Sequence, residues 1–92
     1  MIRLTTTANT GNFIQDIRTE QGTIQFNFLR KTTSWIDKYF ILALDRKLKS
    51  HWFSMVEGKG KWEIESTVKV PQWIRGVEDQ LSEAIVTYNR MN

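Results

Sequence analysis

Residues 23–30 alternate apolar and polar side chains, and this pattern constrains the fold more than any other feature of the chain. Ile24, Phe26 and Phe28 occupy every second position, with polar residues at 23, 25 and 27. Because successive side chains of a β-strand point to opposite faces of a sheet, the alternation predicts a strand with one buried and one solvated face. Such one-sided burial is typical of antiparallel sheets.

The residues before this strand are predicted to add a second one. Residues 13–18 fit a short strand, and Glu20-Gln21-Gly22 fits a turn in which Gly22 adopts positive φ. Residues 1–12 are polar and rich in threonine and asparagine. That composition is compatible with either an edge strand or a loose arm.

A hairpin is predicted in the second half of the chain. Residues 51–56 and 61–66 form its two strands, joined through Glu57-Gly58-Lys59-Gly60, whose glycines suit left-handed backbone positions. Residues 67–70 either continue the second strand or add a short one.

Residues 35–45 are open to two interpretations. As a strand, their side chains divide between two faces, with Ile36, Phe40, Leu42 and Leu44 on one and Trp35, Tyr39, Ile41 and Ala43 on the other. As a helix capped by Ser34, they would present a stripe of Ile36, Phe40, Ala43 and Leu44. The density of aromatic and β-branched residues favours a strand that is buried on both faces. Trp35 is then expected in the core.

Pro71 is predicted to open a helix, because proline lacks an N–H that would have no partner in the first turn anyway. The apolar stripe consists of Ile74, Val77, Leu81, Ile85 and Tyr88, and the residues expected to face away are Arg75, Glu78, Asp79, Ser82 and Glu83. Gly76 costs this helix roughly 1 kcal/mol relative to alanine. Either the close approach of another element or simple tolerance explains it.

The order of these elements predicts an α+β fold. An antiparallel sheet of four or five strands is followed by a C-terminal amphipathic helix, which covers the sheet or pairs with the helix of a second copy. The 92 residues have room for one domain, residues 1–92. A chain of this length buries only roughly 60–65% of its unfolded surface, so a homodimer interface would add to its stability.

Several classes of function find no support in the composition. The chain has no cysteine, and its single histidine, His51, has no clustered acidic partners, so no metal or cofactor is predicted. No nucleophile, base and acid stand in a catalytic pattern. The pair Glu63 and Glu65 fits the solvated side of a strand. We therefore expect a protein that is not an enzyme and has no catalytic residues.

The chain also offers no segment for the membrane. Its N-terminus lacks the apolar centre of a signal peptide, and no stretch reaches the ~20 apolar residues of a membrane span. The net charge is only +3. These features predict a cytoplasmic protein. The absence of cysteine fits a reducing compartment and is equally compatible with export.

Basic and aromatic residues alternate between Arg46 and Trp62, which makes this region the candidate binding site. It contains one acid, Glu57, and five cations: Arg46, Lys47, Lys49, Lys59 and Lys61. Cations neutralise phosphates, and exposed rings stack on unpaired bases. One large ring of residues 51–56, Trp52 or Phe53, is expected to point outward. The same residues are equally compatible with a hairpin whose rings face the core and whose lysines are solvated.

The junction between the hairpin and the helix resembles the PC4/Whirly-type fold of single-stranded-DNA-binding proteins. The likeness rests on residues 67–77, in which a strand runs into a helix bearing Trp73, and on the preceding Gly58-Lys59-Gly60-Lys61-Trp62. It covers about two-thirds of the chain and concerns the layout. It implies a four-stranded antiparallel sheet with basic and aromatic residues, an amphipathic helix after it, and dimers that pair through their helices.

The leading interpretation is a homodimer that binds single-stranded DNA or RNA with little sequence preference, as an accessory protein in transcription or DNA maintenance. Arg46, Lys47, Lys49, Lys59 and Lys61 would contact phosphates, Trp52 or Trp62 would stack on bases, and Arg30 and Lys31 would extend the basic track. The alternative is a non-enzymatic accessory subunit that docks a protein partner through a tryptophan-rich surface, with Trp73, Val77 and Ala84 at the contact.

Overall fold

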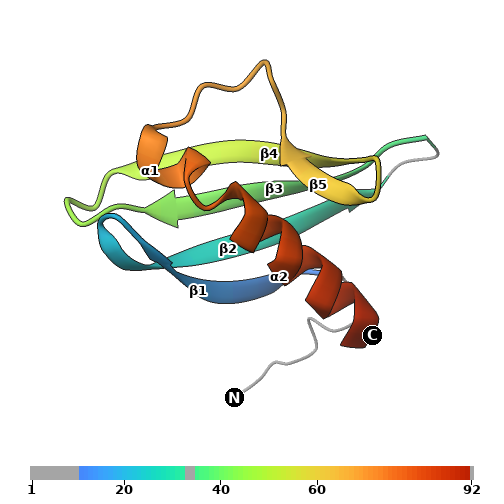
Figure 1. The fold of residues 1–92 in the computed structure, drawn as a ribbon, viewed down its shortest axis with the longest axis horizontal. Coiled ribbons are helices and arrows are strands. Elements are labelled where there is room, and N and C mark those ends of the chain that lie inside the picture. The colour runs from blue at the N-terminus through green and yellow to red at the C-terminus, as the bar shows by residue number, and fades with distance from the viewer. Residues whose placement is uncertain (1–10, 33–34, 92) are drawn as a thin grey trace.

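The computed structural model describes residues 11–32 and 35–91 of the chain (Figure 1). Its elements are β1 (Phe13–Thr19), β2 (Gly22–Thr32), β3 (Asp37–Leu44), β4 (Ser50–Gly58), β5 (Lys61–Ile64), α1 (Gln72–Arg75) and α2 (Glu78–Met91). Each strand pairs with the next one along the chain, always antiparallel, in the order β1-β2-β3-β4-β5. The predicted α+β class is confirmed. Most of the predicted arm or edge strand at 1–12, and the predicted cap at Ser34, lie outside the described residues.

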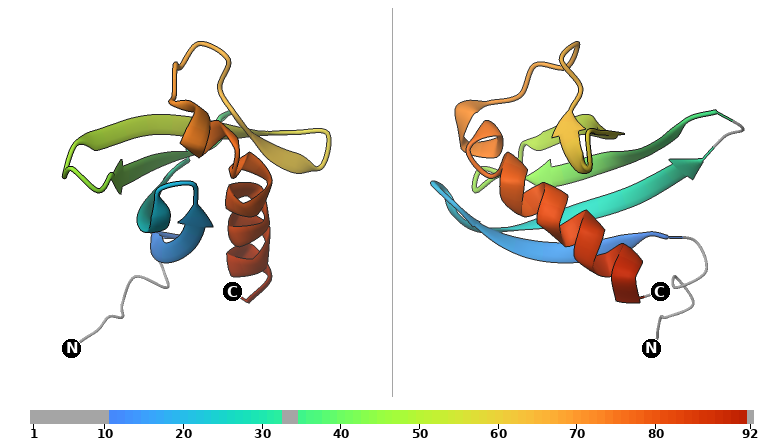
Figure 2. Two further views of the ribbon diagram at one scale, coloured as in Figure 1. Left: turned by 60° about the vertical axis from the view of Figure 1, so that its left-hand side comes forward. Right: turned by 45° about the vertical axis from the view of Figure 1, so that its right-hand side comes forward.

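The sheet is curved, and α2 crosses one of its two faces (Figures 1 and 2). We call the face that α2 covers the inner face and the opposite one the outer face. α2 contacts β5 and β1, the two edge strands. The core therefore lies between the inner face and the helix.

The alternation in residues 23–30 decides which side chains enter this core. Ile24, Phe26 and Phe28 are all buried, as predicted. Ile41 of β3 lies opposite Phe28, and Phe53 of β4 lies opposite Ile41. A row of large apolar side chains thus crosses the inner face from strand to strand.

Both predicted turns are present, and the second differs in detail. Gly22 has a φ of 95°, as expected at the end of the β1–β2 turn. In the β4–β5 hairpin, Gly58 belongs to β4 and pairs with Lys61. The turn is only two residues long, and Lys59 and Gly60 have φ values of 54° and 86°. Two consecutive positive φ values match the right-handed twist of the flanking strands.

Within the segment 35–45, the structure has a strand, β3, at Asp37–Leu44, which confirms the favoured interpretation, but the predicted burial on both faces was wrong. Tyr39, Ile41 and Ala43 are buried on the inner face. On the outer face, Phe40 and Leu44 are exposed, and the Trp35 side chain before the strand is 86% exposed rather than in the core. The physical reason is that α2 packs on the inner face, so it covers only one face of β3.

The C-terminal helix is interrupted, whereas the sequence predicted one continuous element. α1 ends at Arg75, Gly76 and Val77 form a turn, and α2 begins at Glu78. The Val77 N–H donates to the Ile74 carbonyl at 3.0 Å, a tighter turn than an α-helix makes. Gly76 is exposed and has a helical φ of −66°, so no element approaches it and tolerance explains it. Residues 67–70, a predicted strand, form a loop.

Most of the predicted apolar stripe is buried, but two residues expected to face away point to the sheet. Ser82 is 6% exposed, and its Oγ accepts the Trp62 N–H at 2.9 Å. The Glu78 carboxylate accepts the Ile64 N–H at 2.7 Å. Leu81 and Ile85 are fully buried against the chain's own sheet. The dimer paired through this helix stays a prediction.

Candidate functional site on the outer face of the sheet

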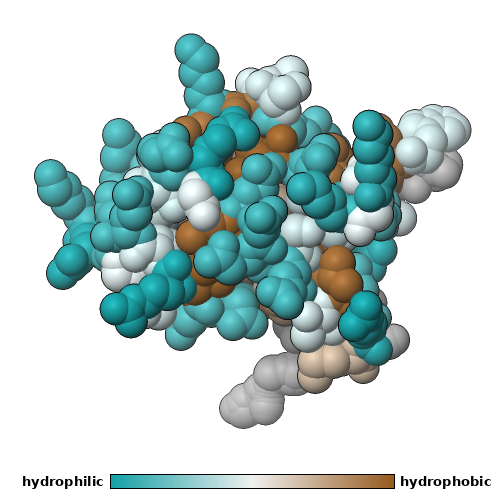
Figure 3. All heavy atoms as spheres, viewed as in Figure 1, coloured by the Kyte–Doolittle hydropathy of each residue, from teal (hydrophilic) through white to brown (hydrophobic). Residues whose placement is uncertain are grey.

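The outer face carries a group of apolar side chains that α2 does not cover. Several of them are exposed by a third or more of their surface, which is unusual for large apolar residues grouped on one sheet face. We call this group the outer patch, and it consists of Ile14, Leu29, Phe40, Leu42, Leu44, Trp52 and Val56. The opposite side of the molecule, seen in Figure 3, shows mostly hydrophilic side chains.

The strand register brings these residues together from four strands. Ile14, Asn27, Leu42 and Trp52 lie opposite one another in one row across β1, β2, β3 and β4. Leu29 and Phe40 follow in the next row. Directly opposite side chains on a sheet lie about 4.5–5.5 Å apart at their Cβ atoms, so the outer patch is continuous.

Trp52 is the outward ring of the basic and aromatic region. Its neighbours Phe53 and Met55 enter the core, and the period of two therefore turns Trp52 to the outer face, where its side chain is 56% exposed. Phe40 lies diagonally across the pair β3–β4, at about 7–8 Å by sheet geometry. Two aromatic rings thus share this surface.

Trp62 and Trp73 are buried, which corrects two expectations. Trp62 is 3% exposed on the inner face and packs edge-on against Tyr39, with ring centroids 5.2 Å apart, so its ring is not accessible for stacking on bases. Trp73 is 7% exposed and contacts His51 and Phe26. The predicted docking edge of Trp73 and Val77 therefore belongs to the core.

The five predicted cations do not form one cluster. Arg46, Lys47 and Lys49 belong to the loop between β3 and β4, whereas Lys59 and Lys61 belong to the β4–β5 hairpin. These segments stand at opposite ends of β4, whose nine residues span roughly 27 Å. All five cations are exposed and make no ion pair within residues 11–32 and 35–91. The cations therefore flank the outer patch at both ends.

The β3–β4 loop is shaped by Asp45. Its Oδ1 accepts the main-chain N–H of Lys47 at 2.8 Å and of Lys49 at 2.9 Å, and its Oδ2 lies 3.0 Å from His51 Nε2. The hydrogen bond with His51, supported by the two N–H donors, holds the pKa of Asp45 below its usual value. The single histidine, His51, is thus a hydrogen-bond partner of Asp45. The cations of the loop, Arg46, Lys47 and Lys49, are exposed.

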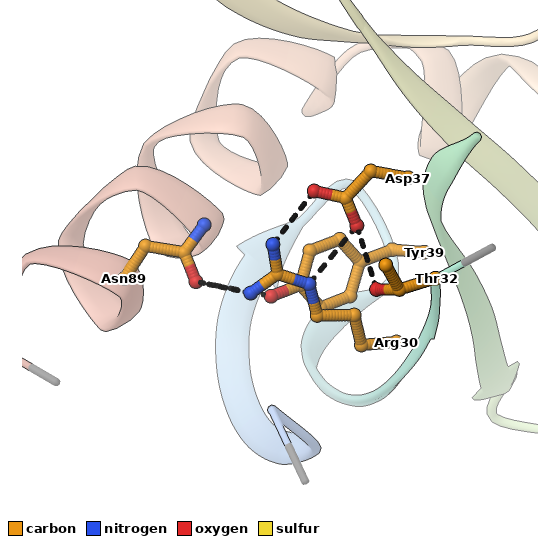
Figure 4. Close-up of polar contacts among 5 residues, drawn as sticks. All are labelled: Arg30, Thr32, Asp37, Tyr39 and Asn89. Carbon is orange, nitrogen blue, oxygen red and sulfur yellow. Dashed lines mark hydrogen bonds and ion pairs between the residues drawn. The ribbon is translucent and has the colours of Figure 1, made fainter. Parts of the chain in front are cut away.

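Arg30 does not extend the basic track, because it lies in a polar cluster on the inner face (Figure 4). Its Nε and NH2 donate to the two oxygens of Asp37 at 3.0 and 2.6 Å, and its NH1 lies 3.5 Å from Asn89 Oδ1. The same Asn89 oxygen accepts the Tyr39 hydroxyl at 3.1 Å. Lys31, by contrast, is exposed in β2 at a register position on the outer face.

A second polar cluster limits the outer patch at β4. The Ser54 hydroxyl and the Lys38 ammonium both donate to Glu65 Oε1, the latter at 3.0 Å. These contacts hold the pKa of Glu65 below its usual value, with the Ser54 hydrogen bond as the larger cause. Lys38 also lies 5.7 Å from the centre of the Phe40 ring. Lys38 is therefore paired with Glu65, unlike the five cations at the two ends of β4.

Among the described residues, no three histidine, aspartate or glutamate side chains are placed to hold a metal ion. No helix in the described part of the chain is long and apolar enough to cross a bilayer.

No family model, curated protein or solved structure matches the chain. The resemblance in layout to PC4/Whirly-type proteins stays a prediction.

Proposed function

We propose that the outer face binds single-stranded nucleic acid with little sequence preference. The observation that carries the proposal is the exposed Trp52 ring beside Phe40, on an uncovered sheet face with free cations at both ends. Stacking on aromatic rings is indifferent to sequence because every base has a π-face. Cations at both ends of the platform are placed to neutralise the phosphates of a strand that crosses it.

The dimensions of the platform favour a short site. A strand laid along β4 would meet Lys47 and Lys49 at one end and Lys59 and Lys61 at the other, roughly 27 Å away. That length corresponds to the lower end of the roughly 4–16 nucleotides that sheet-based single-strand binders occupy. Trp52 lies two residues after the start of β4, so it would stack near the Lys47 end.

The test is a fluorescence titration with a mixed-sequence single-stranded oligonucleotide at low and moderate salt. We expect saturable quenching that weakens as salt rises, because phosphate contacts release counterions. Trp52→Ala should weaken binding by about 5- to 150-fold, the equivalent of about 1–3 kcal/mol per stacked base. Lys47→Ala with Lys49→Ala should weaken binding and flatten the salt slope, by about 1.4 if both lysines contact phosphates.

A matched control removes the same charge from elsewhere. Lys69→Ala with Arg75→Ala deletes two exposed cations of the loop before α1 and of α1 itself. We expect this variant to keep the salt slope of the wild-type protein. Equal losses in both double variants would show a nonspecific effect of net charge and contradict the assignment, as would the absence of quenching at low salt.

The aliphatic part of the outer patch favours a second candidate, a protein partner docked on the same face. Ile14 is 60% exposed, and Leu29 and Leu44 are exposed as well. Such side chains offer no face for base stacking, and contiguous apolar patches mark protein-binding surfaces. Binding of this kind would resist salt and depend on Trp52 and Leu29, whereas the lysine variants would leave it unchanged.

A further inference from the structure

The outward main-chain groups of the two edge strands, β5 and β1, differ in their hydrogen-bond partners. At β5, side chains of α2 accept the outward main-chain donors, since the Trp62 N–H bonds to Ser82 and the Ile64 N–H bonds to Glu78. Along residues 13–19 of β1 the structure shows no such helix contact to the main chain, although just before the strand the Tyr88 hydroxyl of α2 donates to the Asn12 carbonyl at 3.3 Å. One outward main-chain group of β1 has a local side-chain partner, because the Gln15 amide donates to the Asp16 carbonyl at 3.0 Å.

The register decides which residues of β1 direct their main-chain groups outward. The Arg30 N–H points toward the β1 side, where it donates to Asn12 Oδ1 at 2.9 Å. Alternation along β2 then assigns residues 22, 24, 26 and 28 to hydrogen-bonded pairs with residues 19, 17, 15 and 13 of β1. Consequently Ile14, Asp16 and Arg18 direct their N–H and C=O groups away from the sheet.

Space for another strand lies along this edge. A groove of about 570 Å³ runs between β1 and α2. From β1 it is lined by residues that include Gln15 and Ile17, and from α2 by residues that include Glu83, Ala84 and Thr87. The helix therefore leaves a groove beside β1, although its Tyr88 ring stacks on Phe13 with centroids 4.3 Å apart, whereas it closes over β5.

The charges on β1 indicate which kind of strand would pair with this edge. Asp16 and Arg18 are exposed, lie two residues apart on the outer face, and form no ion pair with the described residues. Both have outward main-chain groups, so Asp16 of one copy and Arg18 of another can form a hydrogen-bonded antiparallel pair. Two-fold symmetry repeats that pair on the other side of Ile17, giving two ion pairs of opposite charge.

Neighbouring registers are less favourable. Moving the two-fold axis by one residue in either direction places Asp16 opposite Asp16, or Arg18 opposite Arg18, and like charges directly opposite destabilise a strand pair. A strand edge whose charges are complementary to themselves fits a second copy of the same chain.

We propose that the protein forms a homodimer through its β1 edges, with Asp16 of each copy opposite Arg18 of the other. Pairing about a two-fold axis perpendicular to the sheet joins two five-stranded sheets into one of ten strands. It also places both outer faces on the same side, so that the two Trp52 surfaces form one longer platform. The dimer needs no contact from the apolar stripe of α2 and does not depend on the proposed nucleic-acid binding.

Charge reversal tests the proposal directly. Sedimentation velocity on the whole chain should show a monomer–dimer equilibrium at concentrations up to about 1 mM. Asp16→Arg and Arg18→Asp should each raise the dimer dissociation constant at least about tenfold, because each places like charges opposite one another twice. The double variant D16R/R18D restores opposite charges and should restore the dimer. All three variants should keep the circular dichroism of the wild-type protein, since both side chains are exposed.

Charge reversals away from β1 serve as controls. Glu63→Arg on β5 and Arg75→Asp on α1 reverse exposed charges away from β1 and should leave the dissociation constant unchanged. A wild-type monomer at every concentration would overturn the proposal. A dimer that tolerates both single reversals would show that another surface pairs, and a double variant that stays monomeric would overturn the register. Capture of an unrelated extended peptide by a monomeric protein would assign the edge to another partner.

Discussion

At the scale of single residues, the polar cluster around Arg30 joins three elements at the end of the inner face. Arg30 comes from β2, Asp37 and Tyr39 from β3, and Asn89 from α2. Arg30 forms a two-bond fork with Asp37, the geometry in which guanidinium and carboxylate pair most strongly. The cluster therefore fixes the last turns of α2 to the sheet, although its charged groups keep about a third of their surface exposed.

The same cluster makes stability depend on pH. Its hydrogen bonds from Arg30 hold the pKa of Asp37 below its usual value. Because the folded pKa is depressed, Asp37 stabilises the protein above its unfolded pKa of about 3.9, and this contribution is lost as the pH falls through the folded value. Asp37→Asn should lower the free energy of unfolding at neutral pH, and its difference from the wild-type protein should shrink as the pH falls below about 4.

Urea denaturation at a series of pH values measures this difference. Glu83→Gln is the control, because Glu83 is an exposed carboxylate of α2 beyond its first turn and forms no ion pair in the described part of the chain. Its difference from the wild-type protein should be small at every pH. A constant difference for Asp37→Asn across the series would contradict the role assigned to the ion pair.

At the scale of elements, α2 both covers the core and completes the β5 edge. Its apolar stripe packs on the inner face, while Glu78 and Ser82 of its first turns accept main-chain N–H groups of β5. A strand of only four residues, Lys61–Ile64, has few ladder bonds of its own. Contacts with the helix therefore hold β5 in the sheet.

Ser82→Ala tests this contact. The substitution leaves the Trp62 N–H without its acceptor in a buried position, which should cost about 1–3 kcal/mol of unfolding free energy. Thr87→Ala, at an exposed position of the same helix, is the matched control and should change stability by less than about 0.5 kcal/mol. Chemical denaturation followed by tryptophan fluorescence gives both values. Equal stability of the two variants would show that the hydrogen bond contributes nothing.

At the scale of the whole molecule, the helical layer covers one face of the sheet and leaves the other uncovered. Large aromatic side chains are consequently buried on the inner face and exposed on the outer face. Trp62 packs beneath α2, whereas Trp52, only ten positions earlier in the chain, is more than half exposed. This asymmetry separates residues that stabilise the fold from residues that are available for binding.

Alanine substitution at the two tryptophans measures that separation. Trp62→Ala removes a buried ring and should cost about 3–5 kcal/mol of unfolding free energy. Trp52→Ala should cost less than about 1 kcal/mol of unfolding free energy, while it weakens binding to the outer face by about 5- to 150-fold. Urea denaturation gives the first comparison and the oligonucleotide titration the second. A large loss of stability for Trp52→Ala would mean that the outer face contributes to the core.

Much of the fold was predictable because it depends on local periodicity. The alternation through Ile24, Phe26 and Phe28 indicated the inner face of β2, and the spacing of Ile74, Leu81 and Ile85 indicated the buried stripe of the C-terminal helix. The break after Arg75 was missed, because Gly76 has a helical φ and is compatible with a continuous helix.

The candidate site was predictable only in part. The alternation in β4 predicted that either Trp52 or Phe53 points outward, and the structure decides for Trp52. Phe40 and Leu44 were missed as surface residues, because a strand with apolar side chains on both faces resembles one that is buried on both faces. Leu29 was not singled out, although it continues the face of β2 that was predicted to be solvated. Trp35 was assigned to the core for the same reason.

The sequence by itself determined the class of fold, the order of strands and helix, and the side of β2 that is buried, because these depend on side-chain periods of two and 3.6 residues. Only the tertiary structure decided that Trp62 lies under α2, that Arg30 is held by Asp37, and that the cations flank the outer patch at both ends of β4. Those outcomes depend on which face the single helix covers and on strand register, and both arise from contacts between residues far apart in the chain.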